Sequence, residues 1–346
     1  MIKRDNSLTA QKKGGYIMGM IFSLVAVIVL VAISFMGAKQ NLLGLFGVAI
    51  PYLAVLVFIA GFVRKVIKWG QSPVPFHIPT TCGQQKSLPW IKHSRLDNPS
   101  TSLGVIGRMA LEVLLFRSLF RNLKTDMSDG RAVYGSNKWL WLGSIAFHVT
   151  FVVVFIRHLR FFMEPVPTWV NAIDAADGFL QVGVPHLLIT GVVLLAAATY
   201  LLLRRIFNAQ VKYISLPADY FPLFLIIGIA VSGILMRYFI KVDIIKVKEL
   251  TMGLATFHTT VPDGIGVIFF VHLFLISVFF AYFPFSKLMH LGGVFLSPTR
   301  NLANNSRAVR HVNPWNPKVK LHTYEEYEDE FREVMKSEGI PVEKES

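Results

Sequence analysis

The chain has 346 residues, of which 53% are hydrophobic and 16% are charged, and its mean hydropathy is +0.51. Because the apolar residues come in long blocks, this composition excludes an ordinary soluble domain and predicts an integral membrane protein. The formal net charge of +14 would suggest nucleic-acid binding in a soluble protein, but here it follows the loops between apolar blocks, so no nucleic-acid partner is expected.

Six apolar windows of membrane length predict an all-α integral membrane bundle of six transmembrane helices. We expect the spans at Tyr16–Met36, Leu42–Val63, Trp139–Phe161, Phe179–Leu203, Tyr220–Ile240 and Gly264–Pro284. The first window is long, lacks a small-x-small cleavage pattern and is followed closely by a second span. We therefore expect it to remain as an anchor and not to be removed as a signal sequence.

Basic residues are distributed unevenly between the loops. If the N-terminus is cytoplasmic, the inner segments 1–15, 64–138, 204–219 and 287–346 hold 28 of the 35 Lys and Arg residues. By the positive-inside rule, this asymmetry predicts a multi-pass protein of the cytoplasmic membrane with both termini in the cytoplasm.

The first half of the chain carries few chemically distinctive residues. Residues 1–63 are expected to form a two-helix membrane hairpin with a structural or docking role, since its spans have no ionisable residue in their interiors. In the cytoplasmic loop 64–138, apolar spacing over Ser102–Lys124 predicts an amphipathic helix on the inner leaflet with its arginines at the headgroups, or packed on a soluble partner. The single cysteine, Cys82, is expected to be a loop thiol.

Four histidines stand out in the later spans. His272 and His290 are eighteen residues apart, so on one continuous helix they would share a face, about 27 Å from each other. His148 and His158 in the third span are ten residues apart, which is about 15 Å by helical rise and about 80° by rotation. Straight, parallel helices would therefore not bring both pairs to matching levels.

This pattern of histidines indicates two axially ligated haems, one near each side of the bilayer. The cores of the third and sixth spans hold no carboxylate that a proton relay would favour, and the surroundings are apolar. Because adjacent spans alternate direction, His148 should pair with His290 on the inner side and His158 with His272 on the outer side. The chain has no C-x-x-C-H motif, so both haems would be b-type.

The spacings H-x9-H and H-x17-H, with the ending PFSKLMH, resemble the cytochrome b (gamma) subunit of respiratory nitrate reductase and its relatives. The resemblance covers roughly residues 135–295 and implies the same pairing of inner with inner and outer with outer haem ligands. The additional N-terminal span and the long loop 64–138 look more like the DsrM-type membrane cytochromes b of Dsr complexes in sulfate-reducing and sulfur-oxidising microbes. That likeness implies sulfur respiration, a cytoplasmic iron–sulfur partner like heterodisulfide reductase, and further membrane and periplasmic subunits.

A two-haem electron wire needs a donor and an acceptor, neither of which lies in this chain. We expect a quinone, menaquinone in particular, at the outer side, in contact with residues that could supply protons or hydrogen bonds. The candidates for this quinone site are His186, Arg160, Asp174, Asp177 and His258. Residues 139–295 would then be the di-haem four-helix domain, and 296–346 a cytoplasmic tail that is basic at first and then acidic.

Two other classes of function remain open from the sequence. In a haem-free transporter or membrane scaffold, the four histidines would relay protons or pack helices, and the protein would be colourless. A haem-bearing sensor without a quinone site would hold redox-active haem that added quinol cannot reduce. The electron-transfer interpretation describes a subunit of a quinone-linked oxidoreductase complex, with no catalytic residue of its own.

Overall fold

The computed structural model describes residues 6–72, 83–128, 130–297, 299–305 and 321–344, with the backbone alone over 6–16. Within these ranges six helices are long and apolar enough to cross a membrane, which confirms the expected number of spans. Cys82 and the basic part of the tail, 306–320, lie outside the described residues.

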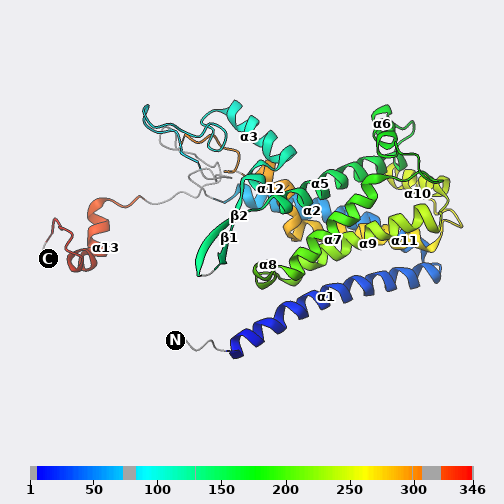
Figure 1. Ribbon diagram of the computed structural model, residues 1–346, viewed down its shortest axis with the longest axis horizontal. Helices are drawn as coiled ribbons and strands as arrows, with labels where there is room; N and C mark the ends of the chain where they lie inside the picture. The colour runs from blue at the N-terminus through cyan, green and yellow to red at the C-terminus, as the bar shows by residue number, and fades with distance from the viewer. Residues whose placement is uncertain (1–5, 73–82, 129, 298, 306–320, 345–346) are drawn as a thin grey trace.

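The spanning helices are joined by short helices and one β-hairpin (Figure 1). The first part of the chain forms α1 (Asn6–Lys39), the π-helical turn η1 (Leu45–Ala49), α2 (Ile50–Gly70), α3 (Ser102–Leu115), α4 (Arg117–Arg121), β1 (Leu123–Ser128) and β2 (Arg131–Ser136). The middle part forms α5 (Lys138–His158), η2 (Leu159–Phe161), α6 (Thr168–Asp177), α7 (Ile189–Phe207), α8 (Ala209–Tyr213), α9 (Pro217–Ile234) and η3 (Leu235–Phe239). The last part forms α10 (Ile244–Thr256), α11 (Val267–Tyr282), η4 (Phe283–Phe285), η5 (Lys287–Met289), α12 (His290–Leu296) and α13 (Tyr324–Ser337).

The spanning helices lie side by side in one bundle (Figure 1). α5 packs on α7, α7 on α9, and α9 on both α1 and α11, while α11 also packs on α2. The short helices α6 and α10 lie at one end of the bundle, here called the α6 end. The hairpin β1–β2, α8 and α12 lie at the opposite end, here called the hairpin end.

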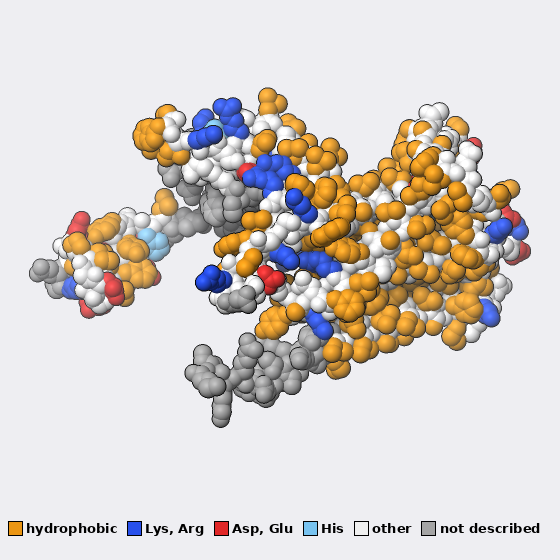
Figure 2. All heavy atoms as spheres, viewed as in Figure 1, with side chains coloured by type: hydrophobic (Ala, Val, Ile, Leu, Met, Phe, Trp, Pro, Cys, Tyr) orange, Lys and Arg blue, Asp and Glu red, His pale blue; other side chains and the backbone are white. Residues whose placement is uncertain are grey.

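The outer surface of the bundle is apolar, as a lipid-facing surface requires. Figure 2 shows hydrophobic side chains over the length of the bundle, with Lys and Arg gathered towards the hairpin end. Phe22, Leu56 and Phe155 are among the large apolar residues exposed there, whereas Phe270, Leu225 and Leu275 fill the interior. These exposed apolar side chains are shielded from water only when lipid covers the outside of the bundle.

The expected helix over Ser102–Lys124 is wrong in its second half. α3 ends at Leu115 because Phe116 adopts a left-handed backbone (φ 48°, ψ 45°), which ends the helical hydrogen bonding. After the single turn of α4, Leu123–Ser128 pairs antiparallel with Arg131–Ser136. The all-α expectation therefore needs one correction, a small exposed hairpin whose second strand carries the β-favouring Val133 and Tyr134.

The arginines of this segment make polar contacts with other parts of the chain. Arg108 is 3% exposed and donates to the carbonyl oxygen of Arg300 at 2.7 Å. Burial, together with the neighbouring Arg300, lowers the pKa of Arg108 below its usual value. Arg117 and Arg121 both form ion pairs with the buried carboxylate of Asp97. These contacts tie α3 and α4 to other parts of the chain, and helical periodicity alone could not reveal them.

Two of the expected spans have different boundaries: the second continues to Gly70 and does not end at Val63, and the fourth begins later than expected. The third and fifth spans agree with expectation to within three residues, but α7 begins at Ile189 and not at Phe179. A loop containing Gly183, at φ 81°, and Pro185 precedes it, and neither residue favours a helix interior. His186, expected inside the fourth span, therefore lies in the loop before it.

The expected continuous helix from Gly264 to His290 is also wrong. α11 ends at Tyr282, ten residues after His272, and two short 3₁₀ turns lead to α12, which begins at His290. Between the two turns Ser286 has an extended backbone (φ −115°, ψ 177°), which breaks the helix. Because the helix does not continue to His290, the separation of about 27 Å expected for His272 and His290 on one helix no longer applies.

The neighbouring helix α2 is shaped to accept this break. A Cβ atom added at Gly61 would lie 2.6 Å from Cβ of Pro284, closer than real Cβ contacts allow. Only a residue without a side chain lets α2 approach η4 this closely, which is the usual role of small residues between membrane helices.

The acidic helix α13 lies apart from the bundle (Figure 1). It is stabilised by hydrogen bonds within the tail. Its N-terminus has a capping box between Thr323 and Glu326. Glu328 is 2% exposed and accepts the backbone N–H groups of Glu343 and Lys344 at 2.8 and 2.9 Å. These two hydrogen bonds lower the pKa of Glu328.

Because the pKa of Glu328 is lowered on folding, its contribution to tail structure is present above the ordinary glutamate pKa and is lost as the pH falls through the folded value. We expect Glu328→Gln to lower, at pH 7, the hydrogen-exchange protection of the Glu343 and Lys344 amides, because the carboxamide keeps one acceptor oxygen in place of two. Wild-type protein should lose the same protection in acid. Glu333→Gln, at an exposed position on the same helix, should not change this protection. Equal losses in both variants would contradict a role for the hydrogen bonds to Glu328.

Candidate functional site

The first of two histidine pairs lies at the hairpin end. His148 of α5 and His290 at the start of α12 have ring centroids 5.8 Å apart, with ring planes at 81°. His148 is half-buried and His290 is exposed. The rings of Phe116 and Phe147 meet His148 edge-on, at centroid distances of 5.0 and 5.1 Å. The left-handed backbone of Phe116 thus places an aromatic ring against this pair.

The second pair lies nearer the α6 end. His158, the last residue of α5, and His272 within α11 have ring centroids 6.4 Å apart, with ring planes at 22°. His272 is 7% exposed, and its Nε2 atom is buried without a hydrogen-bond partner among the described residues. A buried polar atom without a partner is costly, so this nitrogen is suited to a ligand.

All four imidazoles are held through Nδ1. In three of them Nδ1–H donates to a backbone carbonyl oxygen three or four residues earlier in the chain. These bonds are His148 to Ser144 at 2.7 Å, His158 to Val154 at 2.7 Å, and His290 to Lys287 at 2.9 Å. In the fourth, His272 Nδ1 lies 2.8 Å from Oγ of Ser232 on α9. A proton on Nδ1 leaves the Nε2 lone pair available for a metal ion.

The separation of the rings fits a metal ion between them. A metal–nitrogen bond of about 2 Å and a distance of about 1 Å from ring nitrogen to ring centre put two opposed imidazole centroids about 6 Å apart. The observed 5.8 and 6.4 Å agree with this value. Within the described chain, α5 and α11 are not closely packed against each other, and Phe151 and Phe279 meet at 6.0 Å between the two levels.

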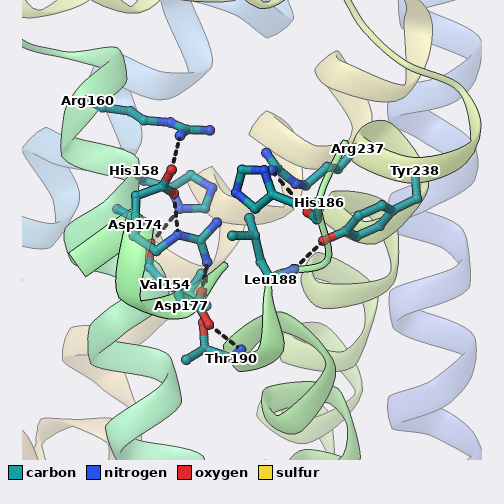
Figure 3. A network of polar contacts seen from close by, with 11 residues as sticks. Val154, His158, Arg160, Asp174, Asp177, His186, Leu188, Thr190, Arg237 and Tyr238 are labelled. Atoms are coloured by element: carbon teal, nitrogen blue, oxygen red, sulfur yellow. Dashed lines mark hydrogen bonds and ion pairs between the residues drawn. The ribbon is translucent and has the colours of Figure 1, made fainter. Parts of the chain in front are cut away.

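A network of ion pairs lies beside His158, one member of the second histidine pair (Figure 3). Arg157, next to His158, is buried and bonds Asp174 at 2.9 Å and Asp177 at 2.5 Å, both on α6. Arg160 also pairs with Asp174, at 3.1 Å. Burial opposes ionisation of Asp174, but the hydrogen bond from Arg157 and the charge of Arg160 outweigh it and lower the pKa of Asp174. Its carboxylate therefore stays ionised at neutral pH.

Asp177 has a clear structural role. Its carboxylate accepts the backbone N–H of Thr190 at 2.7 Å and the Thr190 hydroxyl at 2.6 Å. Thr190 lies in the first turn of α7, where backbone N–H groups lack intrahelical acceptors. Asp177 thus joins α7 to Arg157 on α5 and keeps the end of α5, with His158, in place.

The remaining expected residues lie at the same end of the bundle. His186 packs against Gly178, and its carbonyl oxygen lies 3.4 Å from a guanidinium nitrogen of Arg237, as Figure 3 shows. The hydroxyl oxygen of Tyr238, beside Arg237, accepts a hydrogen bond from the backbone N–H of Leu188 in the same loop at 2.8 Å. His258 is exposed after α10, and no hydrogen bond or ion pair joins it to the other candidates among the described residues.

Sequence reasoning missed three residues that shape the site. Arg157 could have been noticed as a charge next to a histidine within a span, a position where a buried partner is expected. Ser232 gave no signal, because a serine in an apolar helix usually bonds its own backbone. Phe116 gave none either, since its role depends on a left-handed backbone that phenylalanine rarely adopts.

Comparison with known proteins bears on the same region. The family described as nitrate reductase gamma subunit matches residues 109–311, which is more than half of the chain and includes all four histidines. The chain belongs to the nitrate reductase gamma subunit family. The match begins within α3 and extends beyond α12, so it is longer than the 135–295 that the histidine motifs suggested.

Curated relatives of this gamma-family chain come from archaea and bacteria. Two are named Hdr-like menaquinol oxidoreductase cytochrome b-like subunit. The one from Archaeoglobus fulgidus is 47% identical over 280 residues, covering 79% of this chain and 84% of the relative. The one from Archaeoglobus profundus is 42% identical over 283 residues, covering 79% and 83%. The respiratory nitrate reductase 1 gamma chain of Escherichia coli is 27% identical over 187 residues, covering 50% and 79%.

Membership of the gamma family and the six apolar helices together support a multi-pass membrane protein. The archaeal relatives cover more of the chain than the Escherichia coli gamma chain does. The likeness to them therefore includes much sequence outside the part shared with nitrate reductase.

Proposed function

We propose that this chain is the di-haem cytochrome b subunit of a quinone-linked membrane oxidoreductase. The observation that carries the proposal is the pair of histidine couples, His148 with His290 and His158 with His272, whose spacing suits one metal ion in each. Both couples join α5 to the α11–α12 segment, at two levels of an apolar bundle. The cytochrome b in the names of the archaeal relatives supports the same cofactor.

The residues present fit one b-type haem at each couple. Bound haem would supply a one-electron redox centre at each level. His148 and His290 would hold the iron of the inner haem, and His158 and His272 would hold that of the outer haem. The acceptors at Nδ1 fix each ring with Nε2 free, and the rings of Phe116 and Phe147 cover the inner ligand.

A quinone, menaquinone in particular, would exchange electrons at the α6 end. The names of the archaeal relatives include menaquinol oxidoreductase, which supports this choice. Of the five candidate residues, Asp177 is committed to Arg157 and Thr190, and Asp174 stays ionised beside its arginines. Arg160 and His186, both partly accessible, are therefore better placed to donate hydrogen bonds to a quinone, and exposed His258 is the more remote candidate.

The hairpin end would face the cytoplasm and meet an iron–sulfur subunit like heterodisulfide reductase. Lys and Arg gather at that end (Figure 2), as the positive-inside rule requires, so both termini would be cytoplasmic in the cytoplasmic membrane. The Hdr-like names of the relatives support such a partner. We further propose that the complex is of the DsrM type, with additional membrane and periplasmic subunits, and serves sulfur respiration.

The chain would then divide into four parts: the membrane hairpin 1–63, the cytoplasmic segment 64–138, the di-haem domain 139–295 and the tail 296–346. The packing of α1 on α9 and of α2 on α11 joins the first part closely to the third. The two helices of the first part would thus pack as part of the di-haem bundle.

The deciding experiment is a reduced-minus-oxidised visible spectrum of the purified protein, with pyridine haemochrome quantification and a menaquinol analogue as reductant. Two b haems per chain, reducible by the quinol, are expected. Haem that dithionite reduces but quinol does not would favour a sensor without a quinone site. Absence of haem after expression with ample haem supply would overturn the proposal in favour of a haem-free transporter or scaffold.

A further inference from the structure

His272 differs from the other three candidate ligands in what holds its ring. His148, His158 and His290 each bond a carbonyl of their own chain segment, three or four residues away. His272 instead bonds a side chain on a different helix, Oγ of Ser232 on α9, forty residues distant in sequence. Both side chains are buried, at 7% and 5% exposure, so water does not compete for this bond.

The hydrogen bonding of Ser232 defines the direction of this contact. Oγ of Ser232 lies 2.8 Å from the carbonyl oxygen of Gly228 and 3.0 Å from that of Ile229. A hydroxyl has one proton, and these carbonyls can only accept it, so Oγ is left to accept from His272 Nδ1–H. The proton on Nδ1 in turn leaves Nε2, the buried nitrogen without a partner, as the ligating atom.

The backbone next to Ser232 holds the same ring from a second direction. A Cβ atom added at Gly233 would lie 3.3 Å from Cε1 of His272. The ring therefore rests on the bare backbone of Gly233 while its Nδ1 is bonded to Ser232. α9 thus fixes both the position and the rotation of a ligand that belongs to α11.

We propose that Ser232 is a positioning residue that sets the electron-donating strength of His272 and, through it, the reduction potential of the outer haem. The inference rests on the proposed function, since it requires a haem at this couple. An acceptor at Nδ1–H raises the basicity of a ligating imidazole, which favours the oxidised metal. A hydroxyl that α9 supplies can be removed without altering the backbone of α11, whereas the carbonyls behind the other three histidines cannot.

The test is redox potentiometry on the full-length protein, following both haems by visible absorbance. The outer haem is assigned as the one lost in His272→Ala. In Ser232→Ala we expect an upward shift of the outer potential equivalent to about a tenfold change in the oxidation equilibrium, or about 59 mV for one electron. The inner potential should not move, and Ser232→Thr, which keeps a hydroxyl, should restore the wild-type value.

Ser277→Ala is the matched control. Ser277 is 4% exposed, lies on the same helix as His272, and donates to the carbonyl of Leu273 at 2.8 Å, with no hydrogen bond to a histidine of the described chain. Equal outer potentials in Ser232→Ala and Ser277→Ala would overturn the inference and leave the proposed function intact. Wild-type protein without haem would overturn both. If Ser232→Ala loses both haems, Ser232→Cys, with a weaker acceptor of similar size, decides the matter by the presence or absence of an intermediate shift.

Discussion

His272→Ala should leave the protein with one haem per chain, and His148→Ala should do the same at the other level. Each change removes one imidazole of a couple whose two rings stand 6.4 or 5.8 Å apart, and the remaining histidine cannot reach a partner at the other level. The levels are about 15 Å apart along α5, with Phe151 and Phe279 between them. Loss of one couple should therefore not disturb the other.

Pyridine haemochrome quantification would measure the loss, and potentiometry would show that the haem that remains keeps its wild-type potential. His322→Ala is a suitable control, because His322 is exposed in the tail, close to α13. Equal loss of both haems in either variant would mean that the pairing is wrong or that the two sites are not independent.

Asp177→Ala is expected to have the second large effect, on stability. The change leaves the buried guanidinium of Arg157 with one carboxylate in place of two and removes the acceptor for the N–H of Thr190. Breaking a buried ion pair by removing one partner typically costs about 3–5 kcal/mol. We expect a lower thermal unfolding midpoint, with the outer haem released before the inner one.

Asp177→Asn separates the two contributions, because an amide oxygen can still accept from Thr190 but carries no charge. It should fall between the wild type and Asp177→Ala. Asp263→Ala, at an exposed carboxylate of the same end, should unfold like the wild type. If Asp177→Ala also unfolded like the wild type, the network around Arg157 would have no role in holding α5, α6 and α7 together.

The number of spans followed from hydropathy, because membrane thickness imposes a length that composition alone reveals. Which histidines lie together followed from the alternating direction of the spans. The break after Tyr282 did not, since Pro284 and Ser286 can sit within or after a helix, and the choice depends on how Gly61 of α2 packs against them. Long-range packing decides such cases, and a single sequence does not display it.

The polar contacts of the site were equally beyond sequence reasoning. Asp174 and Asp177 were expected to serve a quinone, yet both carboxylates bind Arg157, seventeen and twenty residues earlier. The arginines of the segment after α2 were expected at lipid headgroups, yet Arg117 and Arg121 both bind Asp97. In each case tertiary structure sets the partner and pairs a charged residue with an oppositely charged side chain elsewhere in the fold.

Because the helix breaks between α11 and α12, the spacing of the two histidine couples depends on α5. α5 is unbroken from Lys138 to His158 and carries one histidine of each couple, so its rise alone fixes how far apart the two levels are. The irregular segment from Phe283 to Met289, here called the tether, connects α11 to His290 without a continuous helix. A residue inserted into α5 between the two histidines would turn His158 by about 100° and shift it by about 1.5 Å, whereas the tether could absorb a change in length. We therefore expect length changes to be tolerated between Phe283 and Met289 but not within α5.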